Sequence, residues 1–223
     1  MIPVTVIIPT SPRPSHPSPR IIRDTVVSIS QHFPECPMLI TCDGPESDER
    51  YRAFQENLQY LIAGGLHRGL GMTSTPYHLH QSGLIGPTLE CVHTPLLLYV
   101  EDDWEILPNI EWQVLADAIL SGQFNYIKLH AAPRIHPLHE EKMGEHVRLS
   151  DETFVRRTRQ WSQNPHLAST EFYRRINDLY LKGKTDYIEN IMVGHESFEH
   201  RLGILNPCTG DMMRCRHLDG DQP

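Results

Sequence analysis

Residues 96–105 of the chain read LLLYVEDDWE, a short apolar run that passes directly into a cluster of carboxylates. Such a run, bounded by polar residues, is typical of a β-strand buried on both faces. Side chains that leave the carboxyl end of such a strand gather where open α/β sheets bind ligands. The carboxylates of Glu101, Asp102 and Asp103 therefore predict a site for Mg²⁺ or Mn²⁺, which prefer oxygen ligands and can bridge to phosphate. The alternative is a solvated acidic turn.

Upstream of this stretch, apolar patterns alternate between strand and helix. Residues 4–8 (VTVII) and 38–42 (MLITC) are two further runs of the buried-strand kind. Apolar residues at helical spacing follow each run, first over residues 20–33 and then between Pro45 and Gly64. The order β-α-β-α predicts a largely parallel sheet with helices on both faces.

The rest of the chain extends this pattern less regularly. The expected elements are a loop over 64–83, a short helix over 84–92, a helix after Pro108, a strand over 124–129, a polar excursion over 130–145, an antiparallel strand over 154–161, helices over 169–181 and 187–202, and an irregular end. No repeat or linker divides the chain. We therefore expect a single α/β domain over 1–223, with a first half (1–107) and a second half (108–223).

Composition excludes several classes of protein. The 223 residues include 28 acidic and 20 basic side chains, a formal charge of −8, and the basic ones are scattered, which argues against a nucleic-acid polymer as partner. The five cysteines lack a CxxC spacing and fit reduced thiols. No apolar stretch approaches the roughly 20 residues of a membrane-spanning helix, and the start lacks the features of a secretory signal. A cytoplasmic protein without a transmembrane segment is expected.

The glycines do not indicate a common phosphate-binding loop. Residues 64–71 read GGLHRGLG, which is neither a P-loop nor a full GxGxxG, and this segment does not directly follow the first strand. A P-loop or nicotinamide nucleotide site is therefore disfavoured. A flexible turn and a ligand-binding loop both remain open for these glycines.

Three segments in this order form a recognisable pattern: 4–10 (VTVIIPT), 42–44 (CDG) and 98–103 (LYVEDD). Together they resemble the nucleotide-sugar half of GT-A-fold glycosyltransferases, especially the family-2-like enzymes, although this chain is unusually small. The resemblance implies a GT-A-like, Rossmann-like sheet. It also implies that a strand, a proline and a small polar residue open the donor site. An acid after the second strand would meet the base, and a DXD-type motif would bind metal and diphosphate.

The resemblance implies roles for individual residues. Asp103 would be the direct metal ligand, completed by His217, since these enzymes often use a late histidine. Glu101 stands at the first position of the DXD-type motif, and it and Asp102 would serve metal-bound water or the ribose. The implied donor-binding residues are Pro9, Thr10, Arg13, Asp43, Arg68, Glu101 and Asp102, with Tyr77 and His78 as further candidates.

The second half continues the resemblance. Residues 161–168 (WSQNPHLA) resemble the loop that faces donor sugar and acceptor, and 194–201 (GHESFEHR) stands where the family carries its xED motif. Glu196 would then be the catalytic base, which accepts a proton from the attacking hydroxyl. Glu199 or Glu171 could do this if the register is shifted. The non-functional alternative is that Glu196, Glu199 and Arg201 form an exposed charged face of a helix.

The implied activity is transfer of a hexose from a UDP-sugar to an acceptor hydroxyl, with Mn²⁺ or Mg²⁺ and with inversion at the anomeric carbon. Two alternatives stay open. A sugar nucleotidyltransferase would carry a glycine-rich signature with Arg or Lys directly after the first strand, and residues 11–19 (SPRPSHPSP) provide none. A non-catalytic module of the same fold would bind nucleotide or glycan without turnover. The sugar and the acceptor are not assigned.

Overall fold

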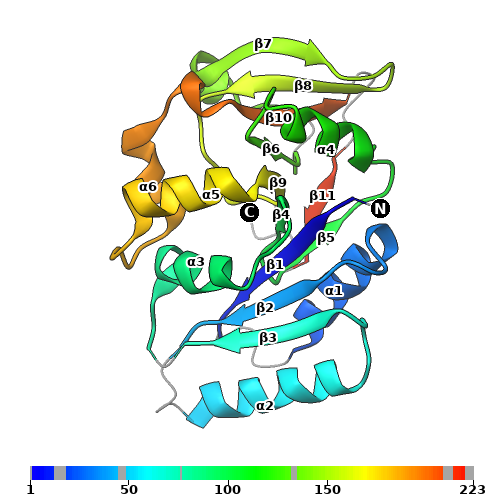
Figure 1. Cartoon of the computed structure of the whole chain (residues 1–223), viewed down its shortest axis with the longest axis vertical. Coiled ribbons are helices and arrows are strands. Elements are labelled where there is room, and N and C mark those ends of the chain that lie inside the picture. Colours follow the sequence, from blue (N-terminus) through cyan, green and yellow to red (C-terminus); the bar gives the residue numbers. More distant parts are fainter. Residues whose placement is uncertain are drawn as a thin grey trace.

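The protein is built on one large mixed β-sheet with helices on both faces (Figure 1). The computed structural model describes residues 2–12, 19–44, 49–75, 77–131, 135–207 and 213–218. The sheet has nine strands in the order β3-β2-β1-β4-β9-β6-β10-β8-β7, and a separate pair joins β11 to β5. The α/β architecture predicted from the sequence is confirmed.

The element bounds follow the chain order. The strands and helices are β1 (Val4–Thr10), α1 (Arg20–His32), β2 (Met38–Cys42), α2 (Glu49–Ala63), β3 (Leu70–Ser74), α3 (His80–Glu90), β4 (Leu96–Tyr99), β5 (Trp104–Ile106), α4 (Trp112–Leu120), β6 (Tyr126–Lys128), η1 (Pro137–Lys142), β7 (Met143–Arg148), β8 (Thr153–Thr158), β9 (His166–Ser169), α5 (Thr170–Ile176), η2 (Asn177–Leu181), α6 (Ile188–Met192), η3 (Val193–His195), η4 (Phe198–His200), β10 (Leu202–Pro207) and β11 (Cys215–His217).

Most strands of the sheet point the same way. β3, β2, β1 and β4 are joined by parallel ladders, and β6 is parallel to β10. Strand β9 lies antiparallel between β4 and β6, and β8 lies antiparallel between β10 and β7. Among the described strands of this sheet, only β9 and β8 therefore run against the rest, so the expectation of a mostly parallel sheet holds.

The sheet is buried on both faces because alternate residues of its central strands enter different cores. Val6 of β1 packs in a core with Val26 of α1 and Leu115 of α4. The next residue, Ile7, packs on the opposite face with Ile85 of α3. All seven residues of β1 are buried, which explains why its sequence is a continuous apolar run rather than an alternating one.

Two edge strands were not predicted. The segment 64–83, expected as a loop, contains β3 and the start of α3, and the excursion over 130–145 contains the start of β7. β3 buries only Leu70, and no residue of β7 is fully buried. Edge strands that bury little need few apolar residues, so neither produced a recognisable apolar run.

Three further expectations of irregular or helical structure were also wrong. Residues 166–168, expected within a loop, and Ser169, expected to begin a helix, form β9 at the centre of the sheet, and the expected irregular end contains most of β10 and all of β11. The helix expected over 187–202 is instead three short pieces, α6, η3 and η4, and Arg201 follows them in a left-handed conformation with φ 52°. These corrections matter because the carboxyl-edge cavity described below uses α6 and β11.

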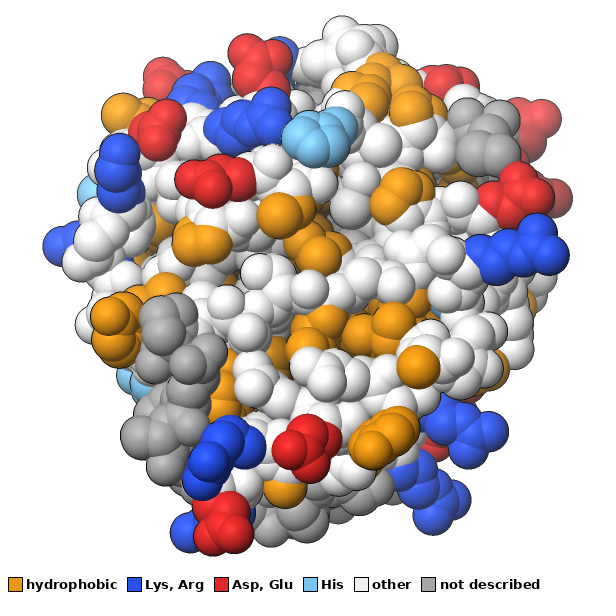
Figure 2. All heavy atoms as spheres, turned by 60° about the horizontal axis from the view of Figure 1, so that its bottom comes forward, with side chains coloured by type: hydrophobic (Ala, Val, Ile, Leu, Met, Phe, Trp, Pro, Cys, Tyr) orange, Lys and Arg blue, Asp and Glu red, His pale blue; other side chains and the backbone are white. Residues whose placement is uncertain are grey.

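The outer surface carries charges of both signs. On the face drawn in Figure 2, Lys and Arg are interspersed with Asp and Glu around a central hollow in which hydrophobic side chains are visible. Within the described ranges, no helix combines the length and the apolar character that crossing a bilayer requires.

Candidate active site

A cavity of about 680 Å³ opens at the carboxyl edge of the parallel strands. It is lined by Pro9, Thr10, Ser11, Asp43, His78, His80, Gln81, Leu84, Glu101, Asp103, Gln163, Tyr187, Glu189, Asn190 and His217. These residues come from the ends of β1, β2 and β4, the start of α3, the segment before β9, α6, and β11. The cavity therefore joins both halves of the chain at the sheet edge where α/β folds bind ligands.

Asp103 and His217 are far apart in the sequence and meet at this cavity. Nε2 of His217 lies 3.2 Å from Oδ2 of Asp103. The pair is aligned because β11 pairs antiparallel with β5, with His217 opposite Trp104, and the Leu218 N–H donates to the Asp103 carbonyl at 2.7 Å. The Trp104 and His217 rings meet nearly edge to face, with centroids 5.0 Å apart.

This pair fits one end of a divalent-cation site. A carboxylate whose side chain is 4% exposed and an imidazole that is 43% exposed both face the cavity. Carboxylate and imidazole are accepted ligands of Mn²⁺, and Mg²⁺ usually takes one or two protein carboxylates with substrate phosphates and water. Within the described part of the chain, no cluster of three His, Cys, Asp or Glu side chains could hold a metal unaided.

The three acids that follow β4 point to different places. Glu101 lines the cavity and accepts a hydrogen bond from the Gln81 amide. Asp102 does not line it: this buried carboxylate accepts a hydrogen bond from the Thr10 hydroxyl, and its carbonyl accepts one from Thr25 Oγ1 at 2.8 Å. Asp102 thus ties the acidic turn to the end of β1 and to α1. Asp103 turns the other way, toward His217.

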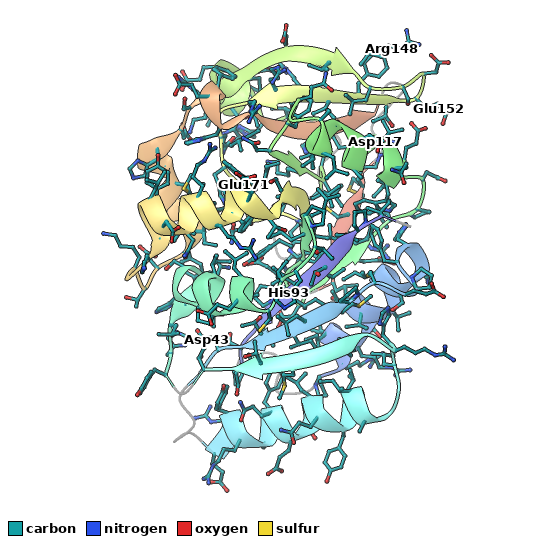
Figure 3. The ribbon with its side chains drawn as sticks, viewed as in Figure 1. Asp43, His93, Asp117, Arg148, Glu152 and Glu171 are labelled. Carbon is teal, nitrogen blue, oxygen red and sulfur yellow. The ribbon has the colours of Figure 1, made fainter. Side chains whose placement is uncertain are left out.

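Asp43 organises the segment that leads into α3. Its side chain is 5% exposed, and its two oxygens accept the backbone N–H groups of Leu79 and His80 at 2.7 and 3.0 Å. Thr75 Oγ1 lies 3.3 Å from Oδ1, and Nδ1 of His78 lies 2.9 Å from Oδ2. Figure 3 shows Asp43 beside the beginning of α3. Asp43 therefore both reaches the cavity and caps the start of this helix.

Gln163, in the segment before β9, also lines the cavity and links several side chains. Its Nε2 donates to the Tyr99 hydroxyl and to Gln81 Oε1, each at 3.2 Å, and its Oε1 accepts the Trp161 indole N–H at 2.8 Å. The carboxylate of Glu189, in the first turn of α6, accepts the Gln163 backbone N–H. This network fixes the Glu189 carboxylate in the lining of the cavity that Asp103 and His217 also line.

Beneath the cavity lies a fully buried aromatic layer. The His166 ring stacks on Tyr99 and Tyr173 with centroids 5.1 and 5.7 Å apart, and Nδ1 approaches the Asn164 carbonyl at 2.7 Å. Burial lowers the pKa of His166 to about 3 and raises the pKa of the Tyr99 and Tyr173 phenols well above their usual value. Burial also lowers the pKa of Lys128, the strand neighbour of His166. Burial therefore makes each of these groups costly to charge.

Several residues singled out in the sequence are brought together. Pro9, Thr10, Asp43, Glu101, Asp103 and His217 all line the cavity, and so does His78. Gln163, from the segment expected to face donor sugar and acceptor, lines it too. Arg13 lies outside the described residues.

Other predicted residues lie elsewhere. Arg68 is exposed and precedes β3, so it stands at the amino edge of the sheet, away from the cavity. Glu196 is not among the cavity-lining residues, and its carboxylate pairs with Lys142 Nζ at 2.8 Å. Glu199 is exposed on η4, and Glu171 follows β9, lining a different hollow at the amino edge. The break between α6 and η3 separates Glu196 from the cavity wall that α6 provides.

The sequence reasoning missed His80, Gln81, Tyr187, Glu189 and Asn190, all of which line the cavity. A signal for Glu189 was present, since it is an acid in the first turn of a helix expected to begin at Tyr187. Nothing in the sequence pattern marked Gln81, because its position depends on where α3 begins.

Sequence comparisons and structure comparisons give different results. No protein-family model matches the sequence, and no curated protein shows significant sequence similarity to it. Solved structures do match. S. aureus TarS residues 1–349 superpose with a TM-score of 0.61 at 15% identity, over 96% of this chain and 60% of that one.

Two further structures show the same likeness. GalNAc-T7 with UDP, GalNAc and Mn²⁺ gives a TM-score of 0.64 at 11% identity, over 97% of this chain and 44% of that one. The mannosyltransferase PcManGT from Pyrobaculum calidifontis, with GDP-Man and Mn²⁺, gives 0.56 at 10% identity, over 91% of this chain and 56% of that one. The chain thus spans roughly half the length of these proteins, and it has a GT-A-like glycosyltransferase fold.

Proposed function

We propose that this chain transfers a hexose from a UDP-sugar to an acceptor hydroxyl, with Mn²⁺ or Mg²⁺ and with inversion at the anomeric carbon. The observation that carries the proposal is the approach of His217 to Asp103, 3.2 Å apart, on the wall of a cavity at the carboxyl edge of the sheet. The nucleotide and Mn²⁺ found with GalNAc-T7, and the GDP-Man and Mn²⁺ found with PcManGT, support a nucleotide-sugar donor.

The proposed donor site uses the residues that end β1, β2 and β4. Pro9 and Thr10 border the cavity beside Asp43, so this side would receive the nucleoside. Asp103 and His217 would hold the cation beside the diphosphate, with Glu101 serving its water shell or the ribose. A bound divalent cation supplies positive charge that stabilises the departing diphosphate.

We give the role of catalytic base to Glu189 in place of Glu196. A base must come within hydrogen-bond reach of the attacking hydroxyl, so the position of a carboxylate is the first criterion for assigning it as the base. Glu189 lines the same cavity as Asp103 and is held by the Gln163 N–H. Glu196 is engaged by Lys142 and does not line the cavity. Glu189 would accept the proton of the acceptor hydroxyl as that oxygen attacks the anomeric carbon.

The first test is calorimetric titration of UDP with and without Mn²⁺, on the wild type and on Asp103→Ala. We expect binding that needs the metal and that Asp103→Ala abolishes. Asp117→Ala is the matched control, because Asp117 is an exposed acid on α4 that does not line the cavity and that Figure 3 shows well away from Asp43. If UDP does not bind with metal present, the UDP assignment fails, and parallel titrations of GDP and CMP decide whether another donor replaces it.

Two product assays separate the remaining alternatives. Release of UDP from UDP-hexoses, with sugar appearing on an acceptor or on water, supports the transferase. Release of pyrophosphate from UTP and a sugar phosphate would instead identify a nucleotidyltransferase. Metal-dependent nucleotide binding without turnover on any acceptor would identify a non-catalytic module.

A further inference from the structure

We propose that His78 reads the nucleobase of the donor as a hydrogen-bond acceptor, with Asp43 as the positioning residue that fixes the imidazole. The site would therefore take a base that carries a ring N–H on its Watson–Crick edge: uracil, thymine or guanine. This inference rests on the proposed function, because it assumes that a nucleotide occupies the cavity.

The first step is that Asp43 has little capacity left to accept from a base. An ionised carboxylate offers about four lone-pair sites. The N–H groups of Leu79 and His80 take one on each oxygen, at 2.7 and 3.0 Å, and Nδ1 of His78 stands 2.9 Å from Oδ2. The Thr75 hydroxyl lies 3.3 Å from Oδ1 and also 2.9 Å from the Tyr77 carbonyl. The Asp43 side chain is only 5% exposed, and groups of the protein itself occupy most of its hydrogen-bonding capacity.

The second step concerns the tautomer of His78. A lone pair on Nδ1 would repel a carboxylate oxygen 2.9 Å away, so Nδ1 carries the proton. In the neutral imidazole the other nitrogen, Nε2, is then an acceptor. The His78 side chain is 47% exposed and lines the cavity, so the part of the ring remote from buried Asp43 is the part available to a ligand.

The third step is that the ring is held in place before any ligand arrives. The His80 ring packs against His78 with centroids 4.1 Å apart and an interplanar angle of 63°. Asp43 fixes one edge of the His78 ring and His80 supports it from the side. A fixed acceptor costs less entropy to use than a mobile one, so it discriminates better between bases.

The chemistry of the bases then sets the preference. Uracil and thymine present N3–H at the centre of the Watson–Crick edge, and guanine presents N1–H. Cytosine and adenine present a ring nitrogen lone pair at that place, which would face the lone pair of Nε2. Two facing acceptors leave both unsatisfied, which costs more than a single lost hydrogen bond.

The test compares the affinities of several nucleotides for the wild type and for a variant that lacks the His78 nitrogens. UDP, GDP, CDP, ADP and N3-methyl-UDP, which lacks the N3–H, are titrated with Mn²⁺ into wild type and into His78→Phe. We expect the wild type to bind UDP or GDP at least about tenfold more tightly than CDP and ADP, and to lose about tenfold on N3-methylation if UDP binds. In His78→Phe, which keeps a ring without nitrogens, these differences should shrink to about twofold. His93→Phe is the control, because His93 is an exposed histidine outside the cavity lining.

Asp43→Asn tests whether Asp43 sets the tautomer of His78, because only that role predicts a change in which base the protein prefers. If the amide N–H faces Nδ1, the proton shifts to Nε2 and the preference should move toward CDP, whereas general loosening would weaken all nucleotides alike. A His78→Phe protein that still distinguishes UDP from N3-methyl-UDP would overturn the inference and leave the proposed function intact. Wild-type protein that binds none of the nucleotides with metal present would overturn both. The wild-type comparison of UDP, GDP and CDP needs no variant, so misfolding of a variant cannot hide a missing preference.

Discussion

Nε2 of His217 lies 3.2 Å from Oδ2 of Asp103, although one residue follows a central strand and the other stands near the end of the chain. The β11–β5 pair brings them together, because its register places His217 opposite Trp104, the neighbour of Asp103. The side chain of Arg216 adds an ion pair with Glu105 on the same two strands. A strand of three residues thus completes a wall of the cavity.

This relationship predicts that the two side chains act as one unit in binding metal and nucleotide. Asp103→Ala and His217→Ala should each remove the Mn²⁺-dependent part of UDP affinity, and the double variant should be no worse than Asp103→Ala alone. The expected coupling energy is ~0.5–3 kcal/mol, typical of residues in one network. Calorimetry of the four proteins measures it. Strictly additive losses would mean that the residues contribute separately.

The position of Glu189 predicts a kinetic difference between two glutamates. Glu189→Gln should lower kcat by roughly 10²–10⁴, the usual contribution of a general base, while leaving the Kd of UDP within a few-fold of wild type. Glu196→Gln keeps the shape of a side chain paired with Lys142 and should change kcat only a few-fold. Initial rates of UDP release with a common acceptor check both. The assignment fails if Glu196→Gln is the variant that loses turnover.

The sequence predicted the fold best at strands that are buried on both faces, because such strands need continuous apolar residues. β1, β2 and β4 are buried runs, and their order along the chain with α1 and α2 was enough to predict the parallel part of the sheet and the placement of Pro9, Asp43 and Asp103 at one edge. Because that edge is fixed by strand direction, the side of the cavity formed by the first half of the chain followed from local patterns alone.

The side of the cavity formed by the second half of the chain could not be predicted in the same way. β9 enters the sheet between β4 and β6 only through long-range pairing, and its sequence, HLAS, has no distinctive apolar run. α6 is five residues long, so helical periodicity could not separate it from the segment that carries Glu196. Arg68 was misplaced for a related reason: β3 is an edge strand with a single buried residue, and its direction decides which sheet edge Arg68 occupies.

Packing around β10 predicts a large effect of a single methyl group. A Cβ on Gly203 would clash with Val155 Cγ1 and would meet Phe124 Cδ1 at 2.9 Å, and both neighbours are fully buried. Gly203→Ala should therefore lower the free energy of unfolding by about 1–3 kcal/mol, the usual cost of overpacking. Gly194→Ala is the matched control, because nothing lies within 4 Å of its Cβ position. Urea denaturation of the three proteins measures the difference, and equal stability of the two variants would contradict it.

The buried layer under the cavity predicts that stability falls in acid. Burial lowers the pKa of His166 to about 3, whereas an unfolded histidine titrates near 6.5. Between these two pKa values His166 binds a proton in the unfolded chain but not in the folded chain. Stability from this residue is therefore complete above about pH 6.5 and is lost as the pH falls toward 3, with a slope approaching ~1.4 kcal/mol per pH unit.

The pH dependence of the wild type alone would not single out His166, since carboxylates and other histidines also titrate in this range. Urea denaturation at pH 7.5, 6.5, 5.5 and 4.5 compares wild type with His166→Gln, and with His93→Gln as an exposed control. The glutamine cannot take up the proton, so the stability advantage of wild type over His166→Gln should shrink as the pH falls. The advantage over His93→Gln should stay nearly constant. An advantage over His166→Gln that does not change between pH 7.5 and 4.5 would show that folded and unfolded His166 titrate alike, and hence that the stack with Tyr99 and Tyr173 admits a charged ring.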